Sequence, residues 1–171
     1  MFSSSNVTVS NSHLRIVYLG DTAQLWLENT AIKYCNVYDQ AQTLVHWLLD
    51  VHVVEWAGDD VPCADVEVMC PEGANGMNGT NGRPTKTVVT GVDGWARLTL
   101  AEKLLTATGE YPAGVYTVRA GYGGYSETTT VNMTENKRIQ LGFKGLSIQE
   151  SGSLLLALLS AVTLLVGRQR P

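Results

Sequence analysis

The sequence predicts an all-β protein: a β-sandwich that follows short repeated strands and precedes an apolar C-terminal segment. Three observations lead to this prediction. Several strand-length segments alternate apolar and polar residues and are separated by turn residues, as in residues 64–70, where every second side chain is apolar. Residues 7–34 contain an internal repeat, and residues 154–167 carry no charge. Side chains alternate between the two faces of a strand, so the alternating segments fit a sheet with one dry and one wet side.

Composition limits the classes of function. The chain has 171 residues, of which 44% are hydrophobic, which is enough for one domain with appendages. Glycine and tyrosine, at 17 and 7 residues, outnumber the two phenylalanines, which favours sheet and turn. The formal net charge of −4 gives no electrostatic basis for binding nucleic acid, and we expect no nucleic-acid partner.

The first 45 residues carry the repeat. Residues 7–12 align with residues 25–30, and Leu14 aligns with Ile32, both at an offset of 18 residues. Short strands at a fixed period near 20 residues indicate a solenoid, and this stretch resembles the last coils of a right-handed β-helix. Asparagine at the repeated turn fits, because it tolerates left-handed backbone. Two ordinary antiparallel strands are the alternative interpretation.

Two coils are too few to be stable alone, because repeat units are stabilised mainly by their neighbours. In addition, the first five residues have neither the basic region nor the apolar core of a secretory signal. We therefore expect residues 1–45 to be the truncated end of a longer set of coils.

Residues 43–56 are predicted to form a strand that leaves the coils and enters the sandwich, which covers residues 46–144. Residues 57–62 form a turn, and residues 64–70 form the next strand. Residues 71–84 repeat Asn-Gly three times, a pair that prefers positive φ, and we expect an exposed connection there.

The second half of the sandwich alternates strands and turns. Residues 91–94 contain the Asp-Gly signal of a tight hairpin, residues 101–108 allow one or two helical turns, and Gly123-Gly124 make another turn. The strands predicted around these features are residues 85–90, 95–100, 115–122, 125–133 and 138–143.

Three segments carry a family resemblance. Residues 58–68 have a turn followed by Ala-x-Val-x-Val, residues 90–98 have Thr-x-x-Asp-Gly, and residues 114–125 have Gly-x-Tyr-x-Val followed by a Gly-Tyr turn. In combination they resemble a carboxypeptidase regulatory-like domain. The resemblance implies an Ig-like, prealbumin-like β-sandwich that has no catalytic residues of its own.

The C-terminus predicts a membrane anchor. We expect a linker over residues 145–152, a transmembrane helix over residues 153–167 and a basic tail over residues 168–171. The apolar stretch is near the lower limit for crossing a bilayer, and the terminal arginines favour the cytoplasmic side. This arrangement resembles the C-terminal anchors of archaeal surface proteins. It implies a single-pass protein of the cell membrane, with the sandwich outside and the C-terminus in the cytoplasm.

Cysteines and glycosylation sequons give the candidate modification sites. Cys35 can pair with Cys63 or with Cys70, and the sequence leaves both pairings open. Cys63 and Cys70 cannot pair with each other, because the strand between them spans about 23 Å. Three Asn-x-Ser/Thr sequons agree with exposure outside the cell and begin at Asn6, Asn78 and Asn132.

No set of residues predicts catalysis, a cofactor or a metal. His46, Asp50 and His52 share one face of a strand but are spread over about 20 Å, too far for a zinc site without another strand. Aspartates in turns can bind calcium, but we expect Asp59, Asp60 and Asp93 to be solvated turn residues. We therefore expect a protein that is not an enzyme and has no cofactor.

Two functions fit this organisation. The first is a non-catalytic structural or adhesive module of the cell surface. It would contact membrane lipid through its C-terminal helix, and a surface protein or polysaccharide through its β-module. The second is the accessory C-terminal part of a surface enzyme that acts on polysaccharide and whose catalytic β-helix is missing. The DNA upstream of Met1 would discriminate between them.

Overall fold

The computed structural model describes residues 5–70 and 84–144 of the chain, and all regular structure in these residues is β-strand. The strands are β1 (Asn6–Ser10), β2 (His13–Leu19), β3 (Gln24–Glu28), β4 (Ala31–Val37), β5 (Gln42–Glu55), β6 (Asp65–Met69), β7 (Pro84–Val89), β8 (Trp95–Thr106), β9 (Gly109–Pro112), β10 (Val115–Tyr122), β11 (Tyr125–Asn132) and β12 (Lys137–Phe143). The all-β prediction is confirmed for these residues.

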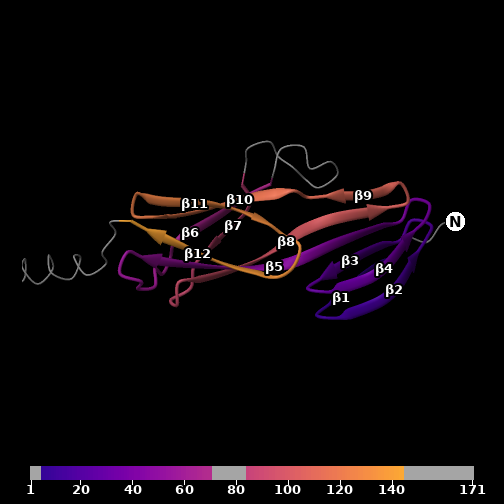
Figure 1. Ribbon diagram of the computed structural model, residues 1–171, viewed down its shortest axis with the longest axis horizontal. Helices are drawn as coiled ribbons and strands as arrows, with labels where there is room; N and C mark the ends of the chain where they lie inside the picture. The colour runs from indigo at the N-terminus through magenta and orange to yellow at the C-terminus, as the bar shows by residue number, and fades with distance from the viewer. Residues whose placement is uncertain (1–4, 71–83, 145–171) are drawn as a thin grey trace, which may run out of the picture.

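The strands form three sheets in an elongated molecule (Figure 1). The largest sheet has the order β1-β3-β5-β8-β9, with β12 also paired to β5. The second has the order β11-β10-β6-β7, and the third consists of β2 and β4. β1 and the end of β12 lie at opposite ends of the molecule (Figure 1). The molecule has a smaller lobe, which contains β1–β4 and β9, and a larger lobe, which contains β6, β7, β10, β11 and β12; β5 and β8 run between the two.

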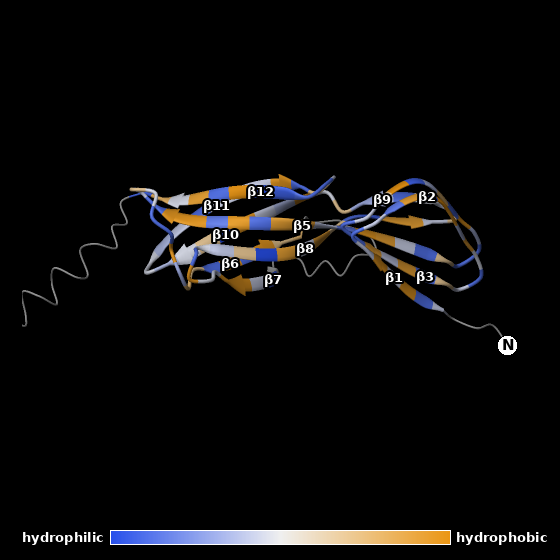
Figure 2. Ribbon diagram, turned by 90° about the horizontal axis from the view of Figure 1, so that it is seen from below, coloured by the Kyte–Doolittle hydropathy of each residue, from blue (hydrophilic) through white to orange (hydrophobic). Residues whose placement is uncertain are grey.

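The larger lobe is a β-sandwich. Its core is made of apolar side chains from every second position of β5, β6, β8 and β10, together with the end of β12, whose Phe143 is buried. The predicted alternation of residues 64–70 is confirmed, because Ala64, Val66 and Val68 are fully buried while Asp65 is exposed. Figure 2 shows the resulting alternation of apolar and polar bands along these strands.

Strand β5 belongs to both lobes. On one edge, residues 42–46 pair in parallel with β3 and residues 49–55 pair in parallel with β12. Its other edge pairs antiparallel with β8 over residues 42–52. At about 3.3 Å per residue, its 14 residues reach about 46 Å. The predicted strand over residues 43–56, which leads from the N-terminal strands into the sandwich, is confirmed.

The N-terminal strands pair in parallel at the offset of the sequence repeat. Val7 of β1 pairs with Leu25 of β3, and Leu14 of β2 pairs with Ile32 of β4. The pairing of β3 with β5 keeps the same offset, with Gln24 opposite Gln42. The alternative of antiparallel strands is therefore wrong for this part of the chain.

Turns that recur at this offset use left-handed backbone. Asn11 and Asn29 have φ values of 52° and 47°, and their side chains form a ladder in which Asn29 Nδ2 donates to Asn11 Oδ1 at 2.7 Å. The ladder continues outside the repeat, because Asn136 Nδ2 donates to Asn29 Oδ1 and Leu48 N donates to Asn136 Oδ1 at 2.9 Å. Asn136 thus fills the gap between β3 and β12 along β5 and ties the two lobes together.

We expect Asn29→Ala to lower the free energy of unfolding by about 2 kcal/mol. The substitution removes both ladder hydrogen bonds of Asn29 and places a Cβ-bearing residue without a polar side chain in left-handed backbone. Urea denaturation of the full chain in mild detergent measures the change. Asn29→Gly keeps the backbone conformation accessible and should cost about half as much; equal losses in the two variants would contradict a backbone contribution.

Two local predictions are wrong. Residues 91–94 turn tightly, with Gly91 N donating to Trp95 O at 2.9 Å, but they do not join a hairpin. β7 pairs with β6 in one sheet and β8 pairs with β5 in the other, so this turn crosses between the sheets. Residues 101–106 are not helical, because they continue β8 between β5 and β9.

Several predicted segments lie outside the described residues. They are the Asn-Gly repeats of residues 71–83, the linker of residues 145–152, the transmembrane helix of residues 153–167 and the basic tail of residues 168–171. Within the part of the chain that the structure describes, no helix has the length and apolar character needed to cross a membrane.

Candidate functional site

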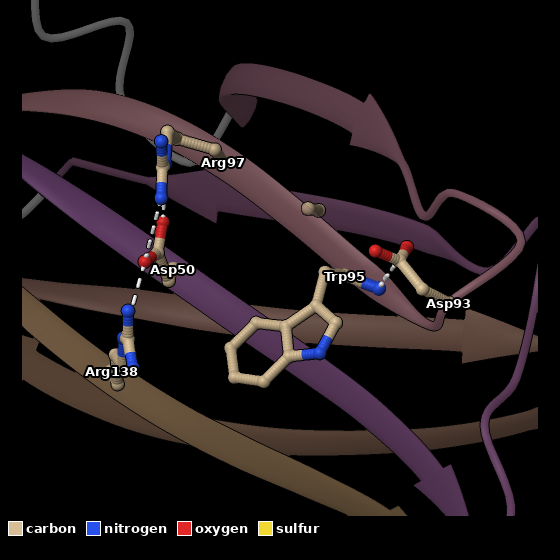
Figure 3. Close-up of a pocket in the computed structure, with 6 residues that line it drawn as sticks. Asp50, Asp93, Trp95, Arg97 and Arg138 are labelled. Atoms are coloured by element: carbon tan, nitrogen blue, oxygen red, sulfur yellow. Dashed lines mark hydrogen bonds and ion pairs between the residues drawn. The ribbon is translucent and has the colours of Figure 1, made fainter.

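The candidate site is a hollow of about 510 Å³ on the outer face of the largest sheet, where β5, β8 and β12 lie side by side (Figure 3). Strand alternation creates it. Leu49 and Val51 point into the sandwich core, so Asp50 between them points outwards, and the same alternation exposes the side chain of Arg97. The residues that line the hollow are Asp50, Asp93, Trp95, Ala96, Arg97 and Arg138.

Two arginines converge on one carboxylate. Arg97 donates from Nε to Asp50 Oδ1 at 2.6 Å and from Nη2 to Asp50 Oδ2 at 3.1 Å, and Arg138 Nε lies 3.4 Å from Asp50 Oδ2. The side chain of Asp50 is 13% exposed, whereas those of Arg97 and Arg138 are 64% and 77% exposed. The carboxylate is therefore covered, and solvent meets mainly the two guanidinium groups.

Trp95 lies beside this row of charges. Its indole stacks on the imidazole of His52, with ring centroids 4.3 Å apart and planes at 2°, and His52 Nε2 is 2.7 Å from Asp60 Oδ1. Figure 3 shows the indole with its broad face toward the viewer, in front of β5. The guanidinium of Arg138 lies 5.9 Å from the centroid of the indole, within the range of a cation–π contact.

The chemistry that these groups offer is binding of anions and of flat rings. A guanidinium has five N–H donors, of which Arg97 uses two on Asp50 and Arg138 uses one. The donors that remain, with a partly exposed indole beside them, suit a ligand that carries an oxyanion next to a ring. Asp50 acts here as the group that positions the two arginines.

Acid should weaken this cluster. The hydrogen bond from Arg97 is the main cause that lowers the pKa of the Asp50 carboxyl below its ordinary value. A lowered pKa in the folded state contributes stability above the unfolded pKa of about 3.9, and that stability is lost as pH falls through the folded pKa. The contribution should be less than about 1 kcal/mol, because the guanidinium partners are exposed.

We therefore expect the melting temperature of Asp50→Asn to fall less than that of the wild type between pH 5 and pH 3. Thermal melts at several pH values in this window measure the two slopes. Thr128→Val, at an exposed position of β11 on the opposite sheet, changes no ionisable group, so it is the control and should keep the wild-type slope. A wild-type slope in Asp50→Asn would contradict the expected role of the Arg97 hydrogen bond.

The structure forms neither of the two disulfides that the sequence leaves open for Cys35, with Cys63 or with Cys70. Cys35 Sγ lies 3.6 Å from Thr43 Oγ1 at the start of β5, whereas Val61, two residues before Cys63, donates its N–H to Val53 O near the end of β5. About 33 Å of strand separates Thr43 from Val53, so Cys35 and Cys63 cannot bond. Cys70 packs against the sandwich core, where burial raises the pKa of its thiol.

The predicted glycosylation sequons and acidic turn residues are spread over several parts of the chain. Asn6 on β1 and Asn132 at the end of β11 are both exposed, and Asn78 lies outside the described residues. Over residues 5–70 and 84–144, no three His, Cys, Asp or Glu side chains come together in a way that could hold a metal ion. Of the predicted turn acids, Asp93 lines the hollow and Asp60 contacts His52.

Sequence reasoning missed most of the candidate site. It singled out Asp50 and His52 on one face of a strand, but not Trp95, Arg97 or Arg138. The alternation of residues 95–100 does place Trp95 and Arg97 on the polar face, so that signal was present. No local signal places Arg138 near Asp50, because the two residues are 88 positions apart.

No protein-family model matches this chain, and no curated protein matches it. Solved structures that resemble it include the TIE protein of Bacillus anthracis, at 18% identity and a TM-score of 0.44, covering 67% of this chain and 19% of that chain. The catechol 1,2-dioxygenase of Acinetobacter radioresistens has 11% identity and a TM-score of 0.44, covering 60% and 53%. A minor pilin of Streptococcus agalactiae has 16% identity and a TM-score of 0.39, covering 64% and 50%.

The chain spans 19%, 53% and 50% of the three solved chains, less than two thirds of each. The packing of β5, β8 and β12 against the sheet of β6, β7, β10 and β11 is what shows a β-sandwich.

Proposed function

We propose that this chain is a non-catalytic structural or adhesive module of the cell surface, held by a C-terminal membrane anchor. In this proposal residues 1–45 are the last coils of a right-handed β-helix, and the sandwich of residues 46–144 is a carboxypeptidase regulatory-like domain outside the membrane. Residues 153–167 cross the bilayer, and residues 168–171 lie in the cytoplasm. Asn6, Asn78 and Asn132 are its candidate glycosylation sites.

The observation that carries the proposal is the continuous strand β5. β5 pairs with β3 and with β12 along the same edge, and the hydrogen bonds of Asn136 close the gap between these two strands. A backbone hydrogen-bonded along its length resists bending between the two lobes, which is what a stalk requires. The N-terminal strands β1–β4 and the C-terminal end of β12 also lie at opposite ends of the molecule (Figure 1).

Labelling of a native cysteine tests the proposed location. Cys63 is exposed, whereas Cys35 and Cys70 are half-buried, so Cys63 should react first with a membrane-impermeant maleimide. We expect intact cells that produce the full chain to be labelled as strongly as lysed cells. Cys63→Ser is the control and should lose most of the label. Labelling of Cys63 only after lysis would contradict the proposal.

Truncation tests the anchor separately. A chain that ends at residue 152 lacks the segment expected to cross the bilayer, and should leave the membrane fraction. The full chain should stay with membranes after extraction at alkaline pH. Retention of the truncated chain in the membrane fraction would rule out residues 153–167 as the anchor.

A second candidate function is the accessory part of a surface enzyme that acts on polysaccharide. The hollow at Trp95, Arg97 and Arg138 favours it, because such groups suit a saccharide that an attached catalytic β-helix would process. The DNA upstream of Met1 separates the two functions. A long β-helix with clustered acidic and basic residues favours the enzyme, and further β-sandwich repeats favour the stalk.

A further inference from the structure

We propose that the hollow formed by Trp95, Arg97, Arg138 and Asp50 is a binding site for a carboxylated saccharide, such as a uronic acid unit of an acidic polysaccharide. The proposal depends on the proposed surface function in one respect: a location outside the cell is where the protein would encounter such a polysaccharide. The binding groups all belong to the described residues.

The exposed guanidinium groups, rather than the net charge of the hollow, would bind an anion, since its four charged lining residues, Asp50, Asp93, Arg97 and Arg138, sum to zero formal charge. Asp50 is covered and contacts both arginines, so each guanidinium keeps exposed donors that Asp50 does not use. Because Arg97 lies on β8 and Arg138 on β12, with β5 between them, the two guanidiniums flank the same carboxylate from opposite sides (Figure 3). A planar fork of donors on each side matches the geometry of a second carboxylate, this time from a ligand.

The indole selects a ring. Trp95 is 37% exposed, and the stacked imidazole of His52 supports one of its faces. His52 is held in turn by Asp60 at 2.7 Å, so the indole rests on a fixed partner. A fixed aromatic face loses little entropy when a sugar ring stacks on it. The indole and the guanidinium of Arg138 lie close enough for one sugar ring and its carboxylate to contact both.

A saccharide fits the hollow better than a protein surface does. Four of the six lining residues are charged, and Trp95 is the one aromatic among them. The centre of a protein–protein interface is usually depleted of charged residues, whereas a polar hollow suits a ligand covered with hydroxyl groups. Its volume of about 510 Å³ is also within the usual range for small-ligand sites.

The test is a titration of the purified full chain, in mild detergent, with trigalacturonate and with its methyl ester. The ester keeps the rings but removes the charges. Calorimetry should show trigalacturonate binding at least about tenfold tighter than the ester, because charge-assisted hydrogen bonds to the arginines are lost. We expect Arg138→Gln to weaken trigalacturonate binding about tenfold and Trp95→Ala to weaken both ligands.

Matched controls separate the site from general charge. Arg119→Gln removes an exposed, ion-paired arginine from the opposite sheet, and Trp56→Ala removes a tryptophan that does not line the hollow; both should bind as the wild type does. Equal binding of acid and ester, or equal loss in Arg119→Gln and Arg138→Gln, would overturn the proposal. Tighter binding of a polyglutamate peptide than of trigalacturonate would also overturn it, in favour of an acidic protein partner. None of these results alters the labelling of Cys63, so the two proposals fail separately.

Discussion

Gly94→Ala is expected to lower the free energy of unfolding by about 3–4 kcal/mol. Gly94 has a φ of 69°, and a Cβ added there would lie 2.8 Å from Val53 O and 3.2 Å from Val61 N. Both contacts are with backbone atoms. The two segments are already fixed, because Val53 N donates to Gly94 O at 2.9 Å and Val61 N donates to Val53 O at 3.0 Å.

The expected loss has two parts. Left-handed backbone costs a residue with a Cβ about 1 kcal/mol, and forcing apart packed backbone costs a further 2 kcal/mol or so. Gly124→Ala is the matched control, because its φ is 86° but no atom lies within 4 Å of an added Cβ. It should lose only about 1 kcal/mol.

Urea denaturation of both variants and the wild type, followed by tryptophan fluorescence, measures the difference. A steric contribution appears as the gap between the two variants, of about 2 kcal/mol. Equal losses at Gly94 and Gly124 would mean that β5 and the segment around Val61 move aside at no cost, which contradicts the close packing at this turn.

The Asp-Gly turn also shows what local sequence can and cannot predict. The residues of a tight turn are recognisable because each must adopt a particular backbone conformation. The pairing of the strands on either side depends on residues far away in sequence. In the structure β7 pairs with β6, and β8 pairs with β5. The prediction located the turn correctly but was wrong in pairing the two strands that flank it with each other.

The failed helical prediction has a different cause. The ladder between β5 and β8 shifts register between Val45 and His46, where Ala101 and Lys103 pair with β5 and Glu102 is passed over. One extra residue changes the alternation of β8 at this point, and the spacing of its leucines then resembles that of a helix. A bulge set by a partner strand cannot be seen in the pattern of one strand alone.

The N-terminal repeat was predictable because residues that are equivalent in the sequence repeat are also paired in the structure. An offset of 18 residues in sequence becomes parallel pairing at the same offset, and Asn11 and Asn29 occupy equivalent turns. No comparable repeat or motif in the sequence marks the candidate site. Asp50 and Arg97 lie on the polar faces of their own strands, but Arg138 reaches Asp50 only because β12 pairs with the edge of β5 that β3 leaves open.

Thr90→Val should cost about 3 kcal/mol although the two side chains have nearly the same shape. Thr90 is 4% exposed, and its Oγ1 accepts a hydrogen bond from Ala64 N at 2.9 Å and donates to Val61 O at 2.7 Å. The backbone of Thr90 makes two more bonds, to Ala64 O and from Cys63 N. Thr90 thus holds in place residues 61–64, the segment that precedes β6. Within this segment Cys63 has a left-handed φ of 59°.

Valine removes the hydroxyl and leaves the buried N–H of Ala64 without this partner, and an unsatisfied buried donor costs about 1–3 kcal/mol in addition to the lost bond. Thr90→Ser keeps the hydroxyl and loses one methyl group, so it should cost only about 1 kcal/mol. Thr128→Val, at an exposed position of β11, should stay within about 0.5 kcal/mol of the wild type. Urea denaturation orders the three variants, and if Thr90→Ser proved as harmful as Thr90→Val, the packing of the methyl group rather than the hydroxyl would hold this segment against the sandwich.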